Sequence, residues 1–275
     1  MAELTWNRYG KSSVRLVKVR RSTEPHEIVD LTIDVALEGA FDKVYTEGDN
    51  SACVATDTMK NTVYAFAKVD PLDHVEIFAS TLAEYFSEKP GVSLVRIQAA
   101  EHPWSRLAAH AFVRGGQEEW TAVVTCREGR TSVASGLRGL VVLKSTDSAF
   151  SGFPRDRFTT LPETRDRILA TSITATWNYA DGFRDFGARL ALRSALLDTF
   201  AAHKSESVQQ TLYAMGDAAL AACAGVTDIQ LSLPNRHHLL VDLSPFGLDN
   251  PNEIFVATEQ PYGLIEARVS RRRSP

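Results

Sequence analysis

The order of predicted strands and helices, which occurs twice along the chain, constrains the fold most. Residues 26–39 alternate apolar side chains with Asp and Thr, a pattern typical of a half-buried strand, and Pro25 marks the turn of a hairpin before them. In residues 72–89 apolar side chains recur every three or four positions, which indicates a helix that ends before Pro90. The first half therefore reads as strands, two helices and strands again, over residues 12–21, 26–39, 56–68, 72–89, 92–102, 120–128 and 130–137.

The second half repeats this order. Strand patterns at residues 140–145 and 172–180 precede two helical patterns, and further strands follow; these segments are 185–203, 207–225, 227–233, 237–245, 252–258 and 263–271. Adjacent strand runs without an intervening helix favour antiparallel pairing, because short turns can join them. We therefore predict an α+β fold of two ββααββ-like units, residues 1–138 and 139–275, with helices on one face of each sheet. Residues 102–119 form an insertion of unassigned role.

Charge and hydropathy exclude several classes of partner. The chain has 30 Lys and Arg against 34 Asp and Glu, and its formal net charge of −4 gives no general attraction to nucleic acid or to an anionic membrane. We expect the basic residues near the C-terminus, Arg271, Arg272 and Arg273, to be solvated. The N-terminus lacks a signal-peptide pattern, and no apolar run approaches the roughly 20 residues that span a bilayer.

Common signatures of cofactor and metal sites are missing from the sequence. Cys53, Cys126 and Cys223 are odd in number and far apart, which favours a reducing cytoplasm over a disulfide framework or a zinc site. No Rossmann glycine fingerprint follows a strand, and the sequence contains no Walker loop, GxSxG or HExxH. An anionic ligand therefore needs a local site, and polar residues at the junctions of strands and helices are its candidates.

Two candidates lie in the first half. Lys11 precedes the first strand and could act as a base, although a surface lysine is the more common situation. Thr56 and Asp57 lie where a helix should begin, and either could be its N-cap. The free backbone amides of such a helix start would also face an anion, so a capping threonine there could serve a ligand as well as the fold.

Three candidates lie in the second half. Thr160 and Glu163 have the spacing of a capping box, which predicts a short helix carrying Arg167. Taken alone, Arg167 would be interpreted as an ordinary exposed charge. Ser207 is the predicted cap of the next helix, and Val208 and Gln209 occupy its first turn, where a negative ligand is favoured. Finally, Asn235 and His237 are two apart on a predicted strand and so share a face, where a histidine could relay protons or be merely structural.

Several strings in the same order carry a resemblance across nearly the whole chain. They are YGK (9–11), VATDTMKNTVYAFAK (54–68), LVVLKSTDSAFSGFPRDRFTTLPETRDRILAT (140–171), SVQQTLYAMG (207–216), LPNRHH (233–238) and DNPNEIF (249–255). Together they resemble urate oxidases. The likeness is weakest between residues 90 and 137.

The resemblance implies a fold and an assembly. Urate oxidases are tandem T-fold (tunnelling-fold) proteins, in agreement with the two units expected from the pattern. They form homotetramers whose sheets build a barrel, with active sites shared between neighbouring subunits. The resemblance also implies a catalytic relay of Lys11, Thr56 and His237.

The resemblance further implies roles in substrate binding. Thr56 and Asp57 receive one edge of the purine from the neighbouring subunit. Phe150 stacks on the ring, and Arg167 holds the O2 and N3 edge as a forked cation for a planar anion. Val208 and Gln209 recognise the opposite edge, and Asn235 lies over the ring where dioxygen and then water bind; the set is Thr56, Asp57, Phe150, Arg167, Val208, Gln209 and Asn235.

The implied activity is the oxidation of urate by dioxygen and water to 5-hydroxyisourate and hydrogen peroxide, without a cofactor or a metal. Two alternatives stay open. Another T-fold enzyme acting on a pterin or a guanine derivative would need a glutamate anchor and metal ligands, against which Gln209 and Arg167 argue. A non-catalytic purine-binding homologue would not need Lys11, Thr56 and His237. The absence of a peroxisomal SKL tripeptide at the C-terminus predicts a cytoplasmic, bacterial enzyme.

Overall fold

A computed structural model describes residues 2–272, which form two compact units. Unit 1 contains the chain up to Leu137 together with Asn178–Gly187, and unit 2 contains Arg138–Trp177 and the chain from Ala188 onward. Strand β7 (Arg130–Lys144) begins in unit 1 and ends in unit 2. The prediction of two separate strands at 130–137 and 140–145 was therefore wrong, because Gly139 adopts a positive φ of 73° without ending the strand. The assignment of residues 1–138 and 139–275 to two T-fold repeats stays a prediction.

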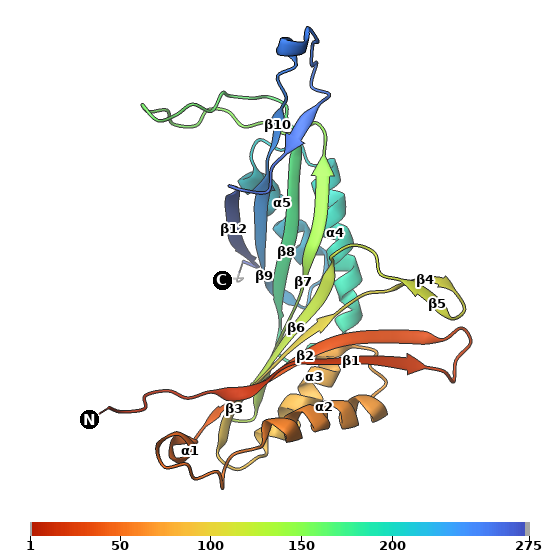
Figure 1. Ribbon diagram of the computed structural model, residues 1–275, viewed down its shortest axis with the longest axis vertical. Coiled ribbons are helices and arrows are strands. Elements are labelled where there is room, and N and C mark those ends of the chain that lie inside the picture. The colour runs from red at the N-terminus through yellow and green to blue at the C-terminus, as the bar shows by residue number, and fades with distance from the viewer. Residues whose placement is uncertain (1, 273–275) are drawn as a thin grey trace. The chain divides into compact units, whose positions relative to one another are not determined.

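Unit 1 is an antiparallel sheet with helices on one face. Its strand order is β1-β2-β3-β6-β7, and α2 packs on β1 while α3 packs on β3 and β6 (Figure 1). The elements are β1 (Tyr9–Arg20), β2 (Glu27–Gly39), α1 (Asp42–Thr46), α2 (Thr56–Val69), α3 (Val75–Ser87), β3 (Val92–Glu101) and β6 (Glu119–Arg127). The register confirms antiparallel pairing of β1 with β2, of β2 with β3 and of β3 with β6.

The core of unit 1 explains why these segments fold as they do. Along β2, alternate residues Leu31, Ile33, Val35 and Leu37 are buried, as the period of two in the sequence predicted. The apolar stripe of α3, which includes the fully buried Phe78, covers them. Each such side chain stabilises the fold by about 1.5–3 kcal/mol relative to its exposed state.

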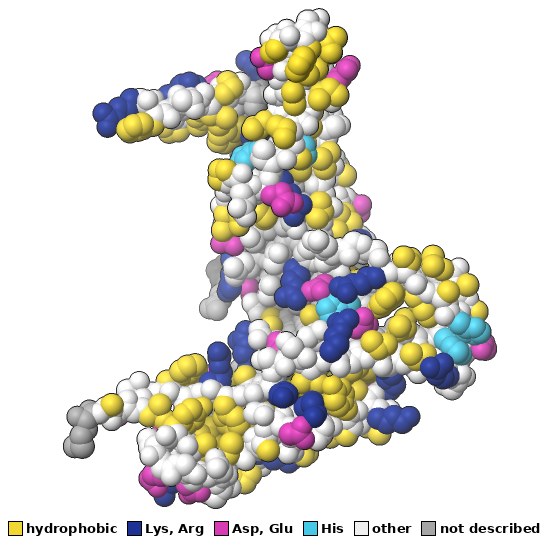
Figure 2. Space-filling view, viewed as in Figure 1, with side chains coloured by type: hydrophobic (Ala, Val, Ile, Leu, Met, Phe, Trp, Pro, Cys, Tyr) yellow, Lys and Arg dark blue, Asp and Glu magenta, His cyan; other side chains and the backbone are white. Residues whose placement is uncertain are grey.

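The insertion at residues 102–119 forms a hairpin of β4 (Ser105–Ala108) and β5 (Ala111–Val113). Polar contacts attach its base to the sheet: the Trp104 indole donates to Asp30 at 2.9 Å, and His102 Nε2 lies 2.8 Å from Thr32 Oγ1. Burial, followed by the charge of Arg15, lowers the pKa of His102. Histidine and acidic side chains gather on the surface over the outer end of this hairpin (Figure 2).

Unit 2 has the same plan. Its strand order is β7-β8-β9-β12, β12 pairs antiparallel with β9, and α5 packs on both of them and on α4 (Figure 1). The elements are β8 (Leu169–Tyr179), whose last two residues belong to unit 1, α4 (Arg189–Ala202), α5 (Val208–Ala222), β9 (Val226–Arg236), β10 (His238–Leu240), η2 (Ser244–Phe246), β11 (Phe255–Ala257) and β12 (Gly263–Ser270); η1 (Phe186–Ala188) begins in unit 1 and ends in unit 2. The predicted α+β class, with antiparallel sheets and helices on one face, is confirmed.

The C-terminal arginines correct one expectation. Arg271 is not merely solvated, because its Nε donates to Val226 O at 2.7 Å and its Nη2 to Cys223 O at 2.7 Å. Cys223 is the C-cap of α5, where a cation is favoured by the helix dipole and by unpaired oxygens, and Val226 is the first residue of β9. Arg273 lies outside the described residues. Among those described, no helix is long and apolar enough to cross a bilayer.

Candidate functional site

A β-bulge determines the direction in which Lys11 points. Lys11 pairs with Val35 and Val14 pairs with Ile33, so two residues of β1 lie opposite a single residue of β2 between these pairs. Val35 and Ile33 are both buried on the face that the helices cover. Directly opposed residues share a face, so Lys11 and Val14 both lie on the helix face although they are three positions apart. In a regular strand, Lys11 would lie on the other face.

Ser13 and Asp34 hold this bulge. The backbone of Ser13 is left-handed, with φ 59°, and its N–H donates to Asp34 Oδ1 at 2.6 Å. A carboxylate acceptor strengthens such a bond, which offsets part of the cost of a left-handed non-glycine residue. At Gly10 a Cβ would lie 1.9 Å from the Val35 carbonyl oxygen, so only glycine fits beside Lys11.

Tyr9 joins the start of β1 to the loop before α2. Its hydroxyl accepts a hydrogen bond from the Val54 N–H at 2.9 Å, and its ring meets Phe41 edge to face with centroids 4.9 Å apart. Burial, followed by a hydrogen bond with Cys53, raises the pKa of Tyr9 to about 12, so the phenol stays neutral. The sequence did not single out Tyr9, although it belongs to the YGK string.

Thr56 and Asp57 occupy the first turn of α2, where helix amides are free. Neither is the N-cap, because the helix begins at Thr56 and Ala55 takes the cap position without a side-chain bond. Asp57 instead pairs with Lys60 and accepts from Asn61 Nδ2 at 2.8 Å. The hydrogen bond from Lys60 and its charge, with a smaller contribution from Lys11, lower the pKa of Asp57. Both Thr56 and Asp57 are exposed in the single chain.

Unit 2 contains a cavity of about 720 Å³. Four of the predicted residues line it: Phe150, Arg167, Asn235 and His237. Its volume falls within the range of roughly 300–1,000 Å³ that is usual for small-molecule sites. The β10–β11 ribbon and the loop before β8 supply other parts of the wall, including Asn252 and Glu253 from the DNPNEIF string.

Arg167 is the chief charged group of this cavity. Burial lowers its pKa, and its Nε is buried without a hydrogen-bond partner among the described residues. Two of the carboxylates that line the same cavity are engaged elsewhere: Asp166 accepts from Thr146 at 2.9 Å, and Glu163 accepts from the Gly152 N–H at 3.1 Å. A half-buried cation with a free donor is costly, so the geometry favours an anionic ligand.

The predicted short helix carrying Arg167 was wrong. The chain from residue 151 to 168 is irregular, and Thr164 forms an antiparallel bridge with Phe150 through backbone bonds of 2.8 and 3.0 Å. This pairing takes the amide and carbonyl that a helix would need. It also brings Arg167 beside Phe150, with the guanidinium carbon 5.3 Å from the ring centroid. The spacing of Thr160 and Glu163 was therefore not a capping box.

The prediction that Ser207 caps α5 is confirmed. Its side chain accepts from the Gln210 N–H at 3.1 Å, and Val208 and Gln209 form the first turn. Gln210 makes the reverse contact, its Oε1 accepting from the Glu206 N–H at 2.9 Å, whereas Gln209 is exposed. The loop of Phe150 adjoins this helix start, because the Ala149 N–H donates to Ser205 O at 2.7 Å.

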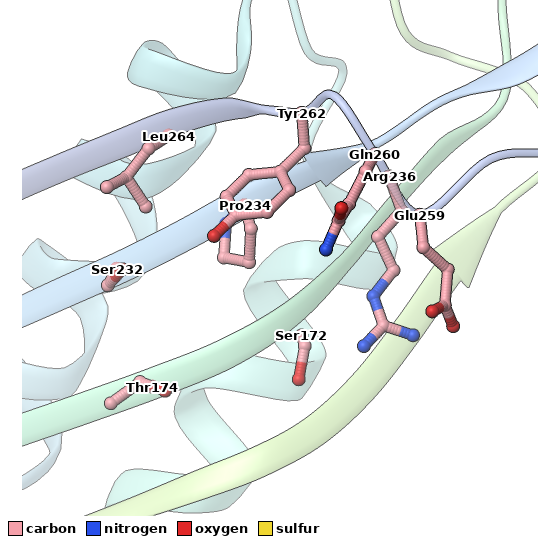
Figure 3. A pocket seen from close by; sticks show the side chains of 9 residues that line it. All are labelled: Ser172, Thr174, Ser232, Pro234, Arg236, Glu259, Gln260, Tyr262 and Leu264. Carbon is pink, nitrogen blue, oxygen red and sulfur yellow. The ribbon is translucent and has the colours of Figure 1, made fainter.

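Side chains near the end of strand β9 alternate between two cavities. Asn235, in β9, and His237, just after it, face the cavity of Arg167, as their spacing predicted. Pro234 and Arg236 line a different cavity of about 380 Å³. Figure 3 shows this second cavity between β8, β9 and the segment that leads into β12, where polar side chains gather around Tyr262.

The predicted site residues fall into two groups. Lys11, Thr56 and Asp57 belong to unit 1, whereas Phe150, Arg167, Val208, Gln209, Asn235 and His237 belong to unit 2. Within unit 2, Phe150, Arg167, Asn235 and His237 share one cavity. The bulge contact of Ser13 with Asp34 was missed, because one extra residue in a strand leaves no mark in a pattern of apolar residues.

Comparison with known proteins decides the family. The Uricase family profile matches residues 7–125 and 133–266. A uricase of Arthrobacter globiformis is 48% identical over 98% of this chain and 90% of its own length. A uricase of Aspergillus flavus is 39% identical over 96% of this chain and 95% of its own length. The chain belongs to the uricase family.

The fold of this uricase family member agrees with a solved relative. The crystal structure of the Arthrobacter globiformis uricase superimposes with a TM-score of 0.96 at 47% identity, covering 100% of this chain and 97% of that one. The T-fold expectation is thereby confirmed. The family also favours the urate oxidase interpretation over the pterin and non-catalytic alternatives.

Proposed function

We propose that the chain oxidises urate with dioxygen and water to 5-hydroxyisourate and hydrogen peroxide. Urate loses two electrons and dioxygen gains them, leaving as hydrogen peroxide with two protons. The hydroxyl oxygen at C5 of the product comes from water. Membership of the uricase family supports the substrate, and an electron-rich urate dianion can pass an electron to dioxygen directly, so the proposal includes no cofactor and no metal.

The observation that carries the proposal is the half-buried guanidinium of Arg167 beside the Phe150 ring, whose Nε has no hydrogen-bond partner among the described residues. A planar anion stacked on Phe150 would present an edge to Arg167, whose fork suits such an edge. Gln209 can donate and accept toward the opposite, amide-like edge, and Val208 adds a backbone contact. Asn235 would face the bound ring, where dioxygen and then water react. A cavity that excludes bulk water strengthens each of these interactions.

The proton relay in this proposal consists of Lys11, Thr56 and His237. Lys11 and Thr56 remove a proton from urate, and His237 passes protons within the cavity that it lines. The bulge and the Gly10 contact support the role of Lys11, because they hold the start of β1 in one register. Asp57, kept anionic by Lys60, accepts from an N–H of the purine.

We also propose that each site is completed by a neighbouring subunit of a homotetramer, whose sheets together form a barrel. The neighbour supplies Lys11, Thr56 and Asp57. The exposure of Thr56 and Asp57 in the single chain supports this arrangement, since the first turn of α2 has free amides for a ligand held by another copy. The three free cysteines support a reducing cytoplasm as the location.

The decisive experiment mixes purified, chelator-treated protein with urate in air and follows urate absorbance, oxygen uptake and peroxide. We expect one dioxygen consumed and one peroxide formed for each urate. Absence of turnover would refute the proposed reaction, and loss of turnover on chelation that returns with a metal would refute the metal-free part.

Two variants test the assigned roles. Arg167→Ala should raise KM roughly 30- to 150-fold, the equivalent of about 2–3 kcal/mol for lost charged hydrogen bonds. Lys11→Ala should lower kcat by about 10²–10⁴ with a smaller effect on urate binding. Arg165→Ala and Lys68→Ala, which remove exposed charges elsewhere in the same two units, serve as controls. If both variants showed the same fall in kcat and the same rise in KM, the assignment would be contradicted.

A further inference from the structure

A cluster of two histidines and a glutamate lies in unit 1, apart from the residues assigned to urate. One ligand atom each from Glu24, His26 and His110 lies within 4.8 Å of the others. His110 Nε2 is 3.0 Å from Glu24 Oε2, His26 Nε2 is 3.7 Å from Glu24 Oε1, and the imidazole centroids are 4.2 Å apart. The sequence predicted no metal site, because neither the cysteines nor any closely spaced motif indicates one.

The cluster joins two hairpins that are distant in sequence. Glu24 and His26 belong to the turn between β1 and β2, and His110 is at the tip of the β4–β5 hairpin. Arg106 holds these hairpins together independently of the cluster, donating to His26 O at 2.5 Å and to Ala109 O at 3.0 Å. Its guanidinium also lies over the Phe112 ring at 4.9 Å. The three candidate ligands are therefore brought together by other contacts.

The chemistry of this donor set favours a divalent transition metal. Two imidazoles and one carboxylate are the ligands that zinc accepts in sites with an open position, where water completes the coordination. Oxygen-preferring Ca²⁺ and Mg²⁺ suit such a set poorly. The side chains are accessible to a metal from solution, since His26, Glu24 and His110 are 20%, 69% and 55% exposed.

We propose that Glu24, His26 and His110 form a zinc site that ties the β4–β5 hairpin to the β1–β2 turn. Lys11 and Arg20 lie at opposite ends of β1, nine residues or roughly 30 Å apart, and the turn follows Arg20. The site is therefore a stabilising link, distinct from the oxidation of urate, and the metal-free reaction proposed above does not depend on it.

Isothermal titration of zinc chloride into the untagged, chelator-treated full chain tests the proposal. We expect one zinc per chain at this site and a higher Tm with zinc present. The variant E24Q/H26N/H110N should weaken this binding at least about tenfold and lose the rise in Tm. E128Q, which changes an exposed glutamate at the β6–β7 turn, should behave as the parent chain does.

Cobalt supplies a second readout that does not depend on stability. Co²⁺ in a four- or five-coordinate site with imidazole ligands gives visible absorption bands, which should appear in the parent chain and in E128Q and be lost in the triple variant. Zinc binding of equal affinity in the triple variant would overturn the proposal. Absence of binding to the parent chain up to roughly 100 µM zinc would overturn it as well.

Discussion

Deletion of Ser12 and Ser13 together should separate the fold of this chain from its chemistry. This double deletion removes both residues that lie opposite Asp34, so β1 can pair with β2 without interruption and Lys11 comes to lie opposite Asp34 instead of Val35. Val14 and the residues after it retain their partners in the core. A slip of one position reverses the face of every residue before the deletion, so Lys11 leaves the face on which α2 lies.

The expected loss is large because catalysis depends on the position of the lysine. A displacement of about 1 Å can cost a factor of roughly 10² in rate, and loss of a general base costs about 10²–10⁴. Moving the Lys11 amine to the other face is a larger displacement than 1 Å. We therefore expect kcat to fall by about 10²–10⁴, equivalent to roughly 3–5 kcal/mol.

The assay compares the deletion with Ser13→Gly. The glycine variant keeps the chain length and relieves the left-handed φ of 59°, so it should retain turnover and gain up to about 1 kcal/mol in stability. Urate oxidation is followed by absorbance, and folding by circular dichroism and thermal denaturation. A folded deletion variant with turnover within about threefold of the parent chain would refute the account of the bulge.

Three further predictions concern other contacts. Ser207→Ala should lower the free energy of unfolding by about 1 kcal/mol in urea titration, because the cap to the Gln210 N–H is lost; no change would contradict the cap. Tyr9→Phe leaves the Val54 N–H without its partner and should cost about 1 kcal/mol of stability together with a several-fold loss of kcat; loss of stability alone would limit Tyr9 to a structural role. The pKa of His102 is lowered in the folded chain, chiefly by burial, so the unfolded chain binds the proton more readily. Stability should therefore fall as the pH drops below about 6.5, and His102→Gln should reduce this dependence in urea titrations at several pH values; an unchanged dependence would contradict it.

The fold could be predicted from the sequence wherever apolar residues recurred with a single period. The alternation along residues 26–39 and the helical stripe of 72–89 report burial directly, and both elements form, the helix over Val75–Ser87. The errors arose where non-local pairing competes with local preference. Thr160 and Glu163 have the spacing of a helix start, but the bridge between Phe150 and Thr164, fourteen residues apart, determines the conformation.

The candidate site was harder to predict from the sequence pattern than the fold was. Spacing placed Asn235 and His237 on one side of a strand, and their shared cavity agrees with it. Nothing local distinguishes Lys11 or Arg167 from surface charges, because the bulge and the bridge that position them involve distant partners. The sequence pattern offered them only as candidates, and the resemblance supplied their roles. The cluster of Glu24, His26 and His110 was missed for the same reason, since His110 is distant in sequence from the other two.

The alternation of β9 has a consequence for evolution and for engineering. Pro234 and Arg236 face one cavity while Asn235 and His237 face another, so adjacent positions are constrained by different surroundings. A library that varies residues 234 and 236 samples new surface chemistry without altering the groups that face the proposed substrate. A library at 235 and 237 does the reverse. Four consecutive positions thus provide two sets of mutations that alter the two cavities separately.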